Sequence, residues 1–140
     1  MVRKGYLLDT NVISELRKPE RNSAVVQWIT ATRHDKLFIS VVTIGEIAKG
    51  IAKRRRTIGG RSSADSLQSW LDGLLATYAD RLIPVDVPIA TRWGRLCDTH
   101  PQLATDMLIA ATALERGLIV VTRNVEHFEI AEVPVVNPFQ

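Results

Sequence analysis

The sequence has few features of secreted or membrane-bound proteins. Its 140 residues include a single cysteine, Cys97, so no internal disulfide can form and nothing indicates an oxidising compartment. No apolar run approaches the roughly 20 residues that a membrane-spanning helix needs, and no charged segment followed by an apolar stretch of signal-peptide length opens the chain. We therefore expect a cytoplasmic protein that makes no membrane contact.

Aromatic residues and histidines are also scarce, at 6% and three residues respectively. The histidines show no spacing typical of metal ligands, so we expect surface or hydrogen-bonded side chains at His34, His100 and His127. The tryptophans stand at core spacings in separate predicted helices, and we assign to packing Trp28, Trp70 and Trp93. We expect neither group of residues to carry the chemistry of the protein.

The remaining composition is typical of one globular domain. Hydrophobic residues make up 46% of the chain, and its length is near the commonest domain size, so we expect a single domain over residues 1–140. The 18 basic and 15 acidic residues leave a net charge of +3. This charge permits contact with nucleic acid but does not require it.

Short apolar runs alternate with segments of helical periodicity along the chain. The pattern predicts strands at residues 5–8, 37–39, 82–85, 118–121 and 133–136. It predicts helices at residues 12–16, 63–78, 88–100 and 107–116, and two more that begin near Ser23 and Thr43. Because the strands are continuously apolar and separated by helices, the predicted fold class is α/β: a three-layer sandwich with a sheet of four or five parallel strands flanked by helices.

Asp9 is the residue around which we place the chemistry. It ends the first apolar run, and Thr10 and Asn11 can open a helix because their side chains accept hydrogen bonds from free N–H groups. Ligands of open α/β sheets bind in the crevice outside the carboxyl ends of the strands, so an acid there is well placed for chemistry. As an isolated residue, Asp9 would be better explained as a helix cap.

Three further polar residues are predicted at the same edge of the sheet. Glu46 and Asp106 stand in the first turns of helices that follow strands, and Asn124 stands just beyond the strand of residues 118–121. Strand ends and the helix starts that follow them share one edge of a parallel sheet, so all three can converge on Asp9. Carboxylates that close raise one another's pKa unless a cation binds between them, and oxygen ligands favour a hard cation, Mg²⁺ or Mn²⁺.

Each of these residues also has a purely structural explanation. Glu46 stands three residues after Thr43, as in a capping box. Asp106 would meet the positive end of a helix dipole, and Asn124 would suit a turn before Val125. These explanations are adequate one by one, but they do not account for the shared edge.

Taken in order, the polar motifs resemble those of PIN-domain ribonucleases. Four segments are similar to successive motifs of that family: Leu7-Leu8-Asp9-Thr10-Asn11, Ser40 to Glu46, Ala104-Thr105-Asp106 followed by Ile109-Ala110-Ala111, and Val121-Thr122-Arg123-Asn124. Residues 9–15 and the ending 135–139 resemble more closely the FitB-type branch of the VapC toxins. The resemblance extends over essentially the whole chain.

The resemblance implies a metal-dependent endoribonuclease that is the toxin of a type II toxin–antitoxin pair. By position, Asp9, Glu46 and Asp106 match the acids that bind Mg²⁺ or Mn²⁺ in the family. Asn124 matches a fourth catalytic position that is often Asp, so this chain lacks the fourth negative charge for a second ion. Three polar residues correspond to side chains that orient the first acid and the pocket: Thr10, Asn11 and Thr122.

The same resemblance implies partners for the chain. The substrate would be RNA, and the inhibitor a VapB-like antitoxin whose segment lies in or beside the acidic pocket. The toxin would form a homodimer and, with the antitoxin, a larger hetero-oligomer. Basic residues that could contact the RNA backbone are Lys49, Lys53, Arg54, Arg55, Arg56, Arg61 and Arg123, although most of them could equally form a solvated helix end.

Other functions fit parts of the sequence. With Asn124 marking a degenerate site, the protein could be a non-catalytic module that binds RNA or an antitoxin; it would then bind metal weakly and tolerate Glu46→Gln. An aspartyl phosphatase would need a second Asp two residues after Asp9, where Asn11 stands. A stand-alone housekeeping nuclease would lack an antitoxin gene immediately upstream.

Overall fold

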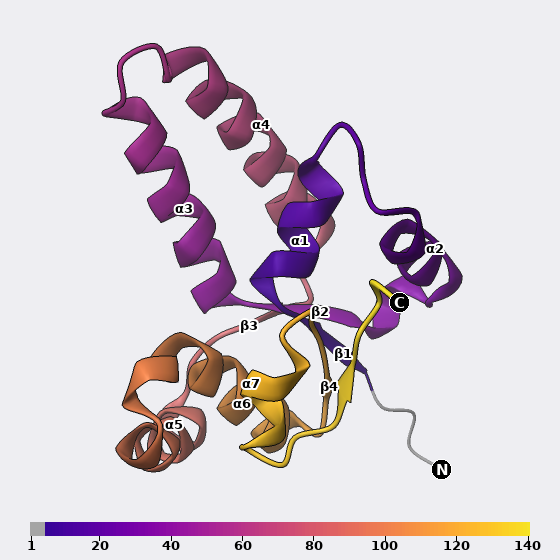
Figure 1. The fold of residues 1–140 in the computed structure, drawn as a ribbon, viewed down its shortest axis with the longest axis vertical. Helices are drawn as coiled ribbons and strands as arrows, with labels where there is room; N and C mark the ends of the chain where they lie inside the picture. The colour runs from indigo at the N-terminus through magenta and orange to yellow at the C-terminus, as the bar shows by residue number, and fades with distance from the viewer. Residues whose placement is uncertain (1–4) are drawn as a thin grey trace.

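The computed structural model describes residues 5–140 and contains one five-stranded parallel sheet between two layers of helices (Figure 1). The strand order is β3-β2-β1-β4-β5, with every pairing parallel. The strands are β1 (Tyr6–Leu8), β2 (Leu37–Ser40), β3 (Leu82–Ile83), β4 (Ile119–Val121) and β5 (Val135–Val136). The predicted α/β sandwich is therefore confirmed. The first four residues of the domain expected over 1–140 lie outside the described residues.

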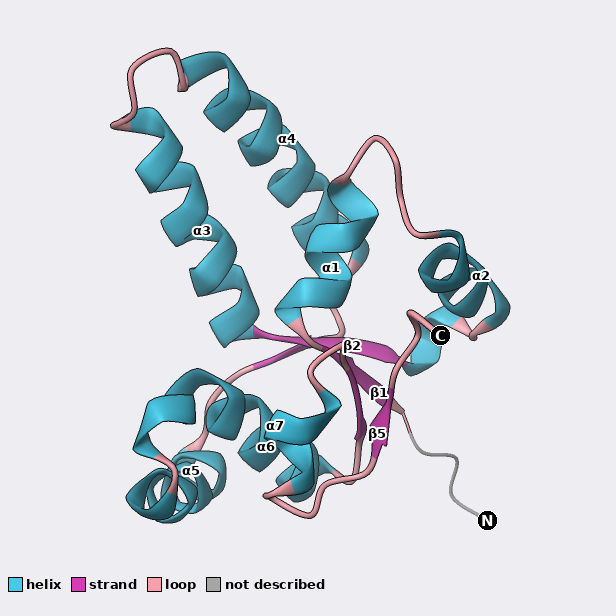
Figure 2. Ribbon diagram, in the orientation of Figure 1, coloured by secondary structure: helices cyan, strands magenta, loops and turns pink. Residues whose placement is uncertain are grey.

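Helices cover both faces of the sheet (Figure 2). On one side lie α1 (Thr10–Arg17), α2 (Ser23–Ala31), α3 (Val41–Arg55) and α4 (Arg61–Thr77). On the other lie α5 (Val87–Thr99), α6 (Ala104–Arg116) and α7 (Val125–Glu129), and two short 3₁₀ turns are η1 (His34–Lys36) and η2 (Pro101–Leu103). In the part of the chain that the structure describes, no helix is both long and apolar enough to cross a bilayer.

The core consists of two buried clusters, one on each face of the sheet. Successive side chains of a strand point to opposite faces, so Leu7 belongs to the cluster under α5, α6 and α7 while Leu8 belongs to the cluster under α1 to α4. Val120 and Val121 of β4 divide in the same way. Because both faces are buried, the strands carry the continuous apolar runs seen in the sequence.

Three helices are capped by residues that stand earlier in the chain than predicted. Asp9, rather than Thr10 or Asn11, caps α1, and its carboxylate accepts the backbone N–H of Thr10. Asn22 caps α2 in place of Ser23. Ser40 caps α3 by accepting the N–H of Val42, so the expected capping box between Thr43 and Glu46 is absent, and Glu46 lies in the second turn. In each case an earlier polar side chain satisfies the free N–H groups.

Two strands are shorter than predicted and one helix was not predicted. β3 ends at Ile83 because Pro84 follows, and proline has no N–H to donate to a neighbouring strand. β5 likewise begins only after Pro134. The segment after Asn124 forms α7, a helix of 5 residues rather than a turn, and its Phe128 is fully buried. The buried phenylalanine explains why so short a helix is held in place.

The sheet order fixes where the carboxyl ends of the strands meet. From β1 the chain proceeds to β2 and β3 on one side, and it returns to β4 and β5 on the other. The order therefore reverses between β1 and β4, and such a switch point leaves a crevice at the carboxyl edge. Asp9 follows β1 at this point, and its N–H donates to the carbonyl of Val121 at 2.9 Å.

Two glycines in this fold should respond in opposite ways to alanine. At Gly73, exposed within α4, an added Cβ meets nothing within 4 Å, whereas Gly117 ends α6 with φ of 66°. We expect Gly73→Ala to raise the free energy of unfolding by about 0.5–1 kcal/mol and Gly117→Ala to lower it by about 1 kcal/mol. Urea denaturation at one pH checks both, and equal shifts of the same sign would contradict the assignment of Gly117 as a left-handed cap.

Candidate active site

Asp9 lies almost completely buried at the switch point, with 5% of its surface exposed. One carboxylate oxygen accepts the N–H of Thr10 at 2.8 Å, and the other accepts the hydroxyl of Thr122 at 2.8 Å. No positively charged side chain pairs with it among residues 5–140. The carboxylate is thus held firmly by neutral donors on α1 and after β4.

Thr122 positions the loop that follows β4. Besides donating to Asp9, its hydroxyl oxygen accepts the N–H of Asn124 at 3.0 Å and lies 3.4 Å from the side-chain nitrogen of Asn11. The side-chain oxygen of Asn11 in turn accepts the N–H of Arg123 at 3.3 Å. Thr122 therefore contacts Asp9 directly, Asn11 contacts the loop after β4, and the exposed Asn124 precedes α7 at the rim.

Glu46 reaches the same edge from α3. Its side chain is exposed, and its Oε1 accepts the hydroxyl of Thr10 at 2.5 Å. The hydroxyl of Thr10 also lies 3.2 Å from that of Thr43, which is buried on the same helix. Thr10 thus joins the helix of Asp9 to the helix of Glu46, a contact that the sequence did not reveal for Thr43.

Asp106 stands in the first turn of α6, as predicted, and it has a partner that was not predicted. Its Oδ2 lies 2.7 Å from Nδ1 of His127 on α7. The side chain of Asp106 is 22% exposed and that of His127 43%. The spacing of the histidines gave no signal for this contact, because Asp106 and His127 belong to two separate helices and stand 21 residues apart.

Burial sets the protonation of Asp9. Burial raises the pKa of this carboxyl from 3.8 to about 6. The hydrogen bonds from Thr122 and Thr10 lower the pKa, but burial has the larger effect. The negative charges of Asp106 and Glu46 raise the pKa of Asp9 further, in smaller measure. Asp106 and Glu46 therefore lie near enough to act electrostatically on Asp9.

The acids do not form a closed metal cage in this arrangement. Among residues 5–140, no three Asp, Glu, His or Cys side chains come together closely enough to hold a metal ion. Glu46 meets Thr10 through Oε1 and Asp106 meets His127 through Oδ2, so the second oxygen of each carboxylate could share an ion with Asp9. The donor chemistry nevertheless suits a cation, because a buried carboxylate without a positive partner gains from one.

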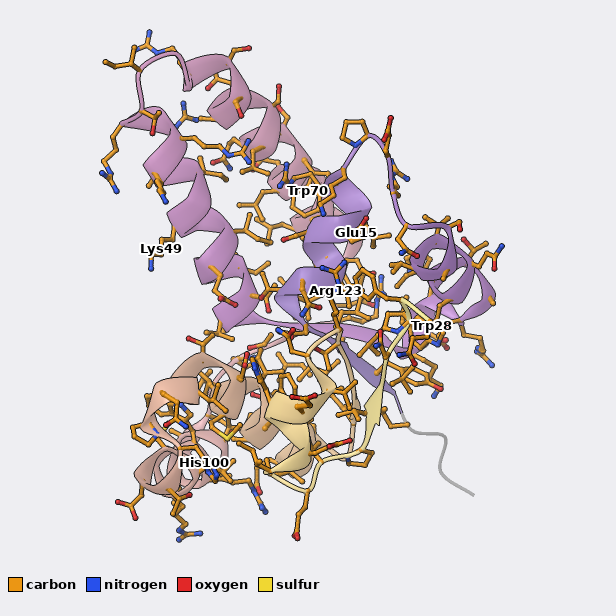
Figure 3. The ribbon with its side chains drawn as sticks, in the orientation of Figure 1. Glu15, Trp28, Lys49, Trp70, His100 and Arg123 are labelled. Atoms are coloured by element: carbon orange, nitrogen blue, oxygen red, sulfur yellow. The ribbon has the colours of Figure 1, made fainter. Side chains whose placement is uncertain are left out.

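Most of the basic residues lie away from this edge. In Figure 3, Lys49 points outward from α3, which projects beyond the sheet with α4. Near the hairpin tip Arg55 pairs with Asp65 at 2.7 Å and Arg54 donates to the hydroxyl of Ser63. Lys53, Arg56 and Arg61 are exposed around the same tip. These charges therefore flank the acidic edge along α3 rather than surround it.

Arg123 is next to the site in sequence but its side chain turns toward α1 (Figure 3). Its guanidinium lies 3.5 Å from the buried carboxylate of Glu15 and 3.9 Å from the centre of the Phe139 ring. Glu15 also accepts the N–H of Asn22, and this hydrogen bond is the main reason that its pKa lies below the usual value. Arg123 thus links the loop after β4 to both α1 and the end of the chain.

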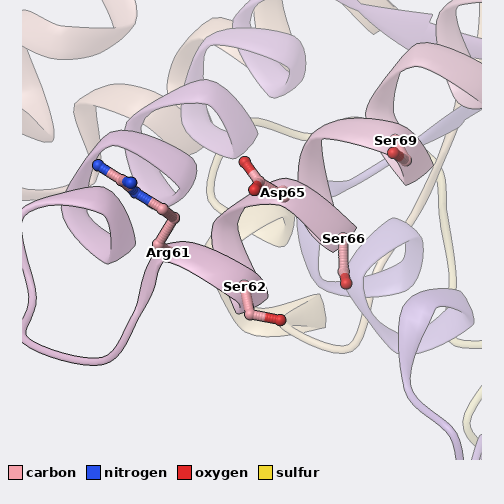
Figure 4. Close-up of a pocket in the computed structure, with 5 residues that line it drawn as sticks. All are labelled: Arg61, Ser62, Asp65, Ser66 and Ser69. Atoms are coloured by element: carbon pink, nitrogen blue, oxygen red, sulfur yellow. The ribbon is translucent and has the colours of Figure 1, made fainter.

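A depression on the outer surface of α4 has no buried carboxylate and no group of acids (Figure 4). It measures about 530 Å³ and is lined by Arg61, Ser62, Asp65, Ser66 and Ser69. All five residues come from one helix, and its only carboxylate is paired with Arg55. The depression is a shallow surface feature without converging groups, and the candidate site remains the acidic edge.

Comparison with known proteins agrees with this geometry. The PIN domain family profile matches residues 6–133. Toxin FitB of Neisseria gonorrhoeae is 33% identical over 138 residues, covering 95% of this chain and 97% of the toxin. VapC ribonuclease Y4jK of Sinorhizobium fredii is 35% identical over 147 residues, covering 96% of this chain and 97% of that protein.

Solved structures give the same result. The crystal structure of FitAcB from Neisseria gonorrhoeae superposes with a TM-score of 0.84 at 33% identity, covering 96% of this chain and 99% of that one. A toxin–antitoxin complex from Klebsiella pneumoniae matches with a TM-score of 0.64 at 25% identity, covering 96% of this chain and 98% of that one. The chain therefore belongs to the PIN-domain family, within its VapC/FitB-type toxin ribonucleases.

The raised pKa of Asp9 predicts a definite pH dependence of stability. Between pH 4 and 6 the folded protein holds a proton that the unfolded chain releases, so the stabilisation present below pH 4 is lost as pH rises through about 6. The loss amounts to about 3 kcal/mol. We expect Asp9→Asn, compared with the wild type by urea denaturation in EDTA, to become relatively more stable over this range; a difference independent of pH would contradict the buried, unpaired carboxyl.

Proposed function

We propose that this protein hydrolyses RNA phosphodiester bonds at the acidic edge of its sheet, as the toxin of a toxin–antitoxin pair. The observation that carries the proposal is the buried, unpaired carboxylate of Asp9, flanked by Glu46 and Asp106 at the switch point. The ribonuclease class rests on membership of the VapC/FitB-type group. We further propose that residues 1–140 act as one domain.

Asp9, Glu46 and Asp106 would hold one Mg²⁺ or Mn²⁺, in keeping with their oxygen-only donor set. When bound, such an ion lowers the pKa of a water molecule and balances the charge that builds up on the phosphate. Thr10 and Thr122 hold the carboxylate of Asp9 by one donor on each oxygen, so this carboxylate is fixed before substrate arrives. Asn124 supplies no negative charge, so we assign it to hydrogen bonding with water or phosphate at the rim.

The protein's own residues have two tasks in this reaction. The acids orient the attacking water, and Thr10 keeps Glu46 beside the first turn of α1. The basic side chains along α3 and at the tip of the α3–α4 hairpin would attract the RNA backbone; they are Lys49, Lys53, Arg54, Arg55, Arg56 and Arg61. Arg123 is a weaker candidate for this role than its position in the sequence indicates, because Glu15 and Phe139 already contact its guanidinium.

We propose a VapB-like antitoxin as the inhibitor, and a homodimer of the toxin that joins it in a larger complex. The similar Klebsiella pneumoniae structure is a toxin–antitoxin complex, which supports the proposal of an antitoxin partner. An arginine from the antitoxin could pair with the acids and so occupy the place of the cation. Because both RNA and a newly made antitoxin are found there, we place the action of the toxin in the cytoplasm.

Metal-dependent cleavage is the direct test. Purified, antitoxin-free protein should cut a mixed-sequence structured RNA with Mg²⁺ or Mn²⁺ and not with EDTA. The double substitution Asp9→Asn, Asp106→Asn should reduce cleavage at least about 100-fold, because it removes two negative charges from the site. The matched control is Asp98→Asn on the outer surface of α5, which should cut like the wild type. Equal activity of the double variant and the wild type would instead favour a non-catalytic binding module.

The role of the α3 basic residues can be measured separately, as salt dependence of RNA binding in EDTA. Each lost contact with a single-stranded phosphate lowers the slope of log K against log salt by about 0.7. We therefore expect the pair Lys53→Gln, Arg56→Gln to lower it by about 1.4 in total. Arg95→Gln, an exposed change on α5 across the sheet, should leave the slope unchanged. The same slope in all three proteins would assign the basic run to a solvated helix end.

A further inference from the structure

A cleft leads away from the acidic edge between α1 and the α3–α4 hairpin. Its inner part, about 130 Å³, is lined by Thr10 and Glu46 of the candidate site together with Gly50 and Trp70. The adjoining outer part, about 370 Å³, extends past Pro19. The two parts share four lining residues: Arg17, Arg54, Leu67 and Trp70. The cleft is therefore one continuous path that begins at Glu46.

Trp70 differs from the other two tryptophans in the contacts that its ring makes. Trp28 packs edge-on against the ring of Tyr6 at 5.0 Å. The indole N–H of Trp93 donates to the carbonyl of Ala104 at 2.8 Å. Trp70 is half-buried on α4, where it lines the cleft facing α1, and within residues 5–140 its indole N–H makes no hydrogen bond (Figure 3). The assignment of all three to packing is thus incomplete for Trp70.

The charges around Trp70 are positive and available. Arg17 makes no ion pair with any residue from Gly5 to Gln140, and Arg54 donates only to the neutral hydroxyl of Ser63. The one carboxylate that lines the cleft is Glu46, which belongs to the acidic edge. An aromatic ring and two cationic side chains that line one cleft are the combination with which proteins bind single-stranded nucleic acid.

We propose that Trp70, Arg17 and Arg54 form a subsite for one unpaired RNA base and its flanking phosphates, next to the bond that is cut. The subsite rests on the proposed ribonuclease function and adds to it a preference for unpaired RNA. A base inside a duplex cannot stack on Trp70, so the cleft favours single-stranded RNA and loops. A docked peptide helix would need a row of apolar pockets. The outer walls carry Pro19, Leu67 and Trp70 but also two arginines and two serine hydroxyls, a mixture that suits a base and its phosphates.

Tryptophan fluorescence tests the stacking directly. In EDTA, a mixed-sequence single-stranded RNA of 12 nucleotides should quench the wild type, and Trp70→Phe should lose most of the quenching while still binding. Trp70→Leu, which keeps an apolar side chain for the core but no ring, should bind about 5- to 100-fold more weakly. Circular dichroism confirms that each variant is folded. Quenching that is equal in wild type and Trp70→Phe, or that appears with a co-purified antitoxin and not with RNA, would overturn the proposal.

Blocking the cleft offers a second test that leaves Trp70 in place. An added Cβ at Gly50 meets nothing within 4 Å, so Gly50→Leu places a side chain into the inner cleft without disturbing the core. Gly73→Leu is the matched control, because Gly73 is also an unobstructed helical glycine but lies outside the cleft. Only Gly50→Leu should weaken RNA binding, by about 10-fold or more; equal binding by both variants would overturn the proposal.

The two proposals fail in different ways. If the protein binds and is quenched by RNA but never cuts it, the ribonuclease proposal fails and the subsite stands. If metal-dependent cleavage is present but abasic substitutions along the RNA affect wild type and Trp70→Leu equally at every position, the subsite fails and the ribonuclease stands. One position at which the abasic change weakens only the wild type would identify the stacked base.

Discussion

The buried carboxylate of Asp9 is the contact on which the rest of the site depends. Its two oxygens join the start of α1 to the loop after β4, two segments that are far apart in sequence and adjacent in the sheet. Burying a charge without a positive partner is unfavourable, and the protein tolerates it at the one place where the strand order reverses. The unfavourable energy is confined to this one carboxylate. The same carboxylate therefore attracts a cation.

Much of the fold and part of the site could be predicted because they depend on local patterns. Continuous apolar runs predicted the parallel sheet, and Gly117 marks the end of α6. The ends of the strands predicted the edge to which Asp9 and Asp106 belong. The helix starts were wrong where an earlier polar residue, Asn22 or Ser40, capped the helix instead. Such competition between neighbouring caps depends on small differences in backbone angles that the residue types do not specify.

The contacts that sequence reasoning missed all join segments distant in the chain. Thr43 meets Thr10, and His127 meets Asp106, only because α1, α3, α6 and α7 converge on one edge. Trp70 stands at core spacing along α4, and this spacing does not reveal that its ring also lines a cleft. Periodicity reports which face of a helix is apolar, but not whether another element covers the whole of that face.

The link from Glu15 through Arg123 to Phe139 bears on when the protein first becomes active. Thr122, which holds Asp9, lies 113 residues after it in the chain, and Phe139, which contacts Arg123, lies further on still. During translation Asp9 and the first helix leave the ribosome long before their partners exist. The acidic edge is therefore incomplete on a nascent chain until the segment that carries Thr122 has been made, so this part of the protein can assemble only late in folding.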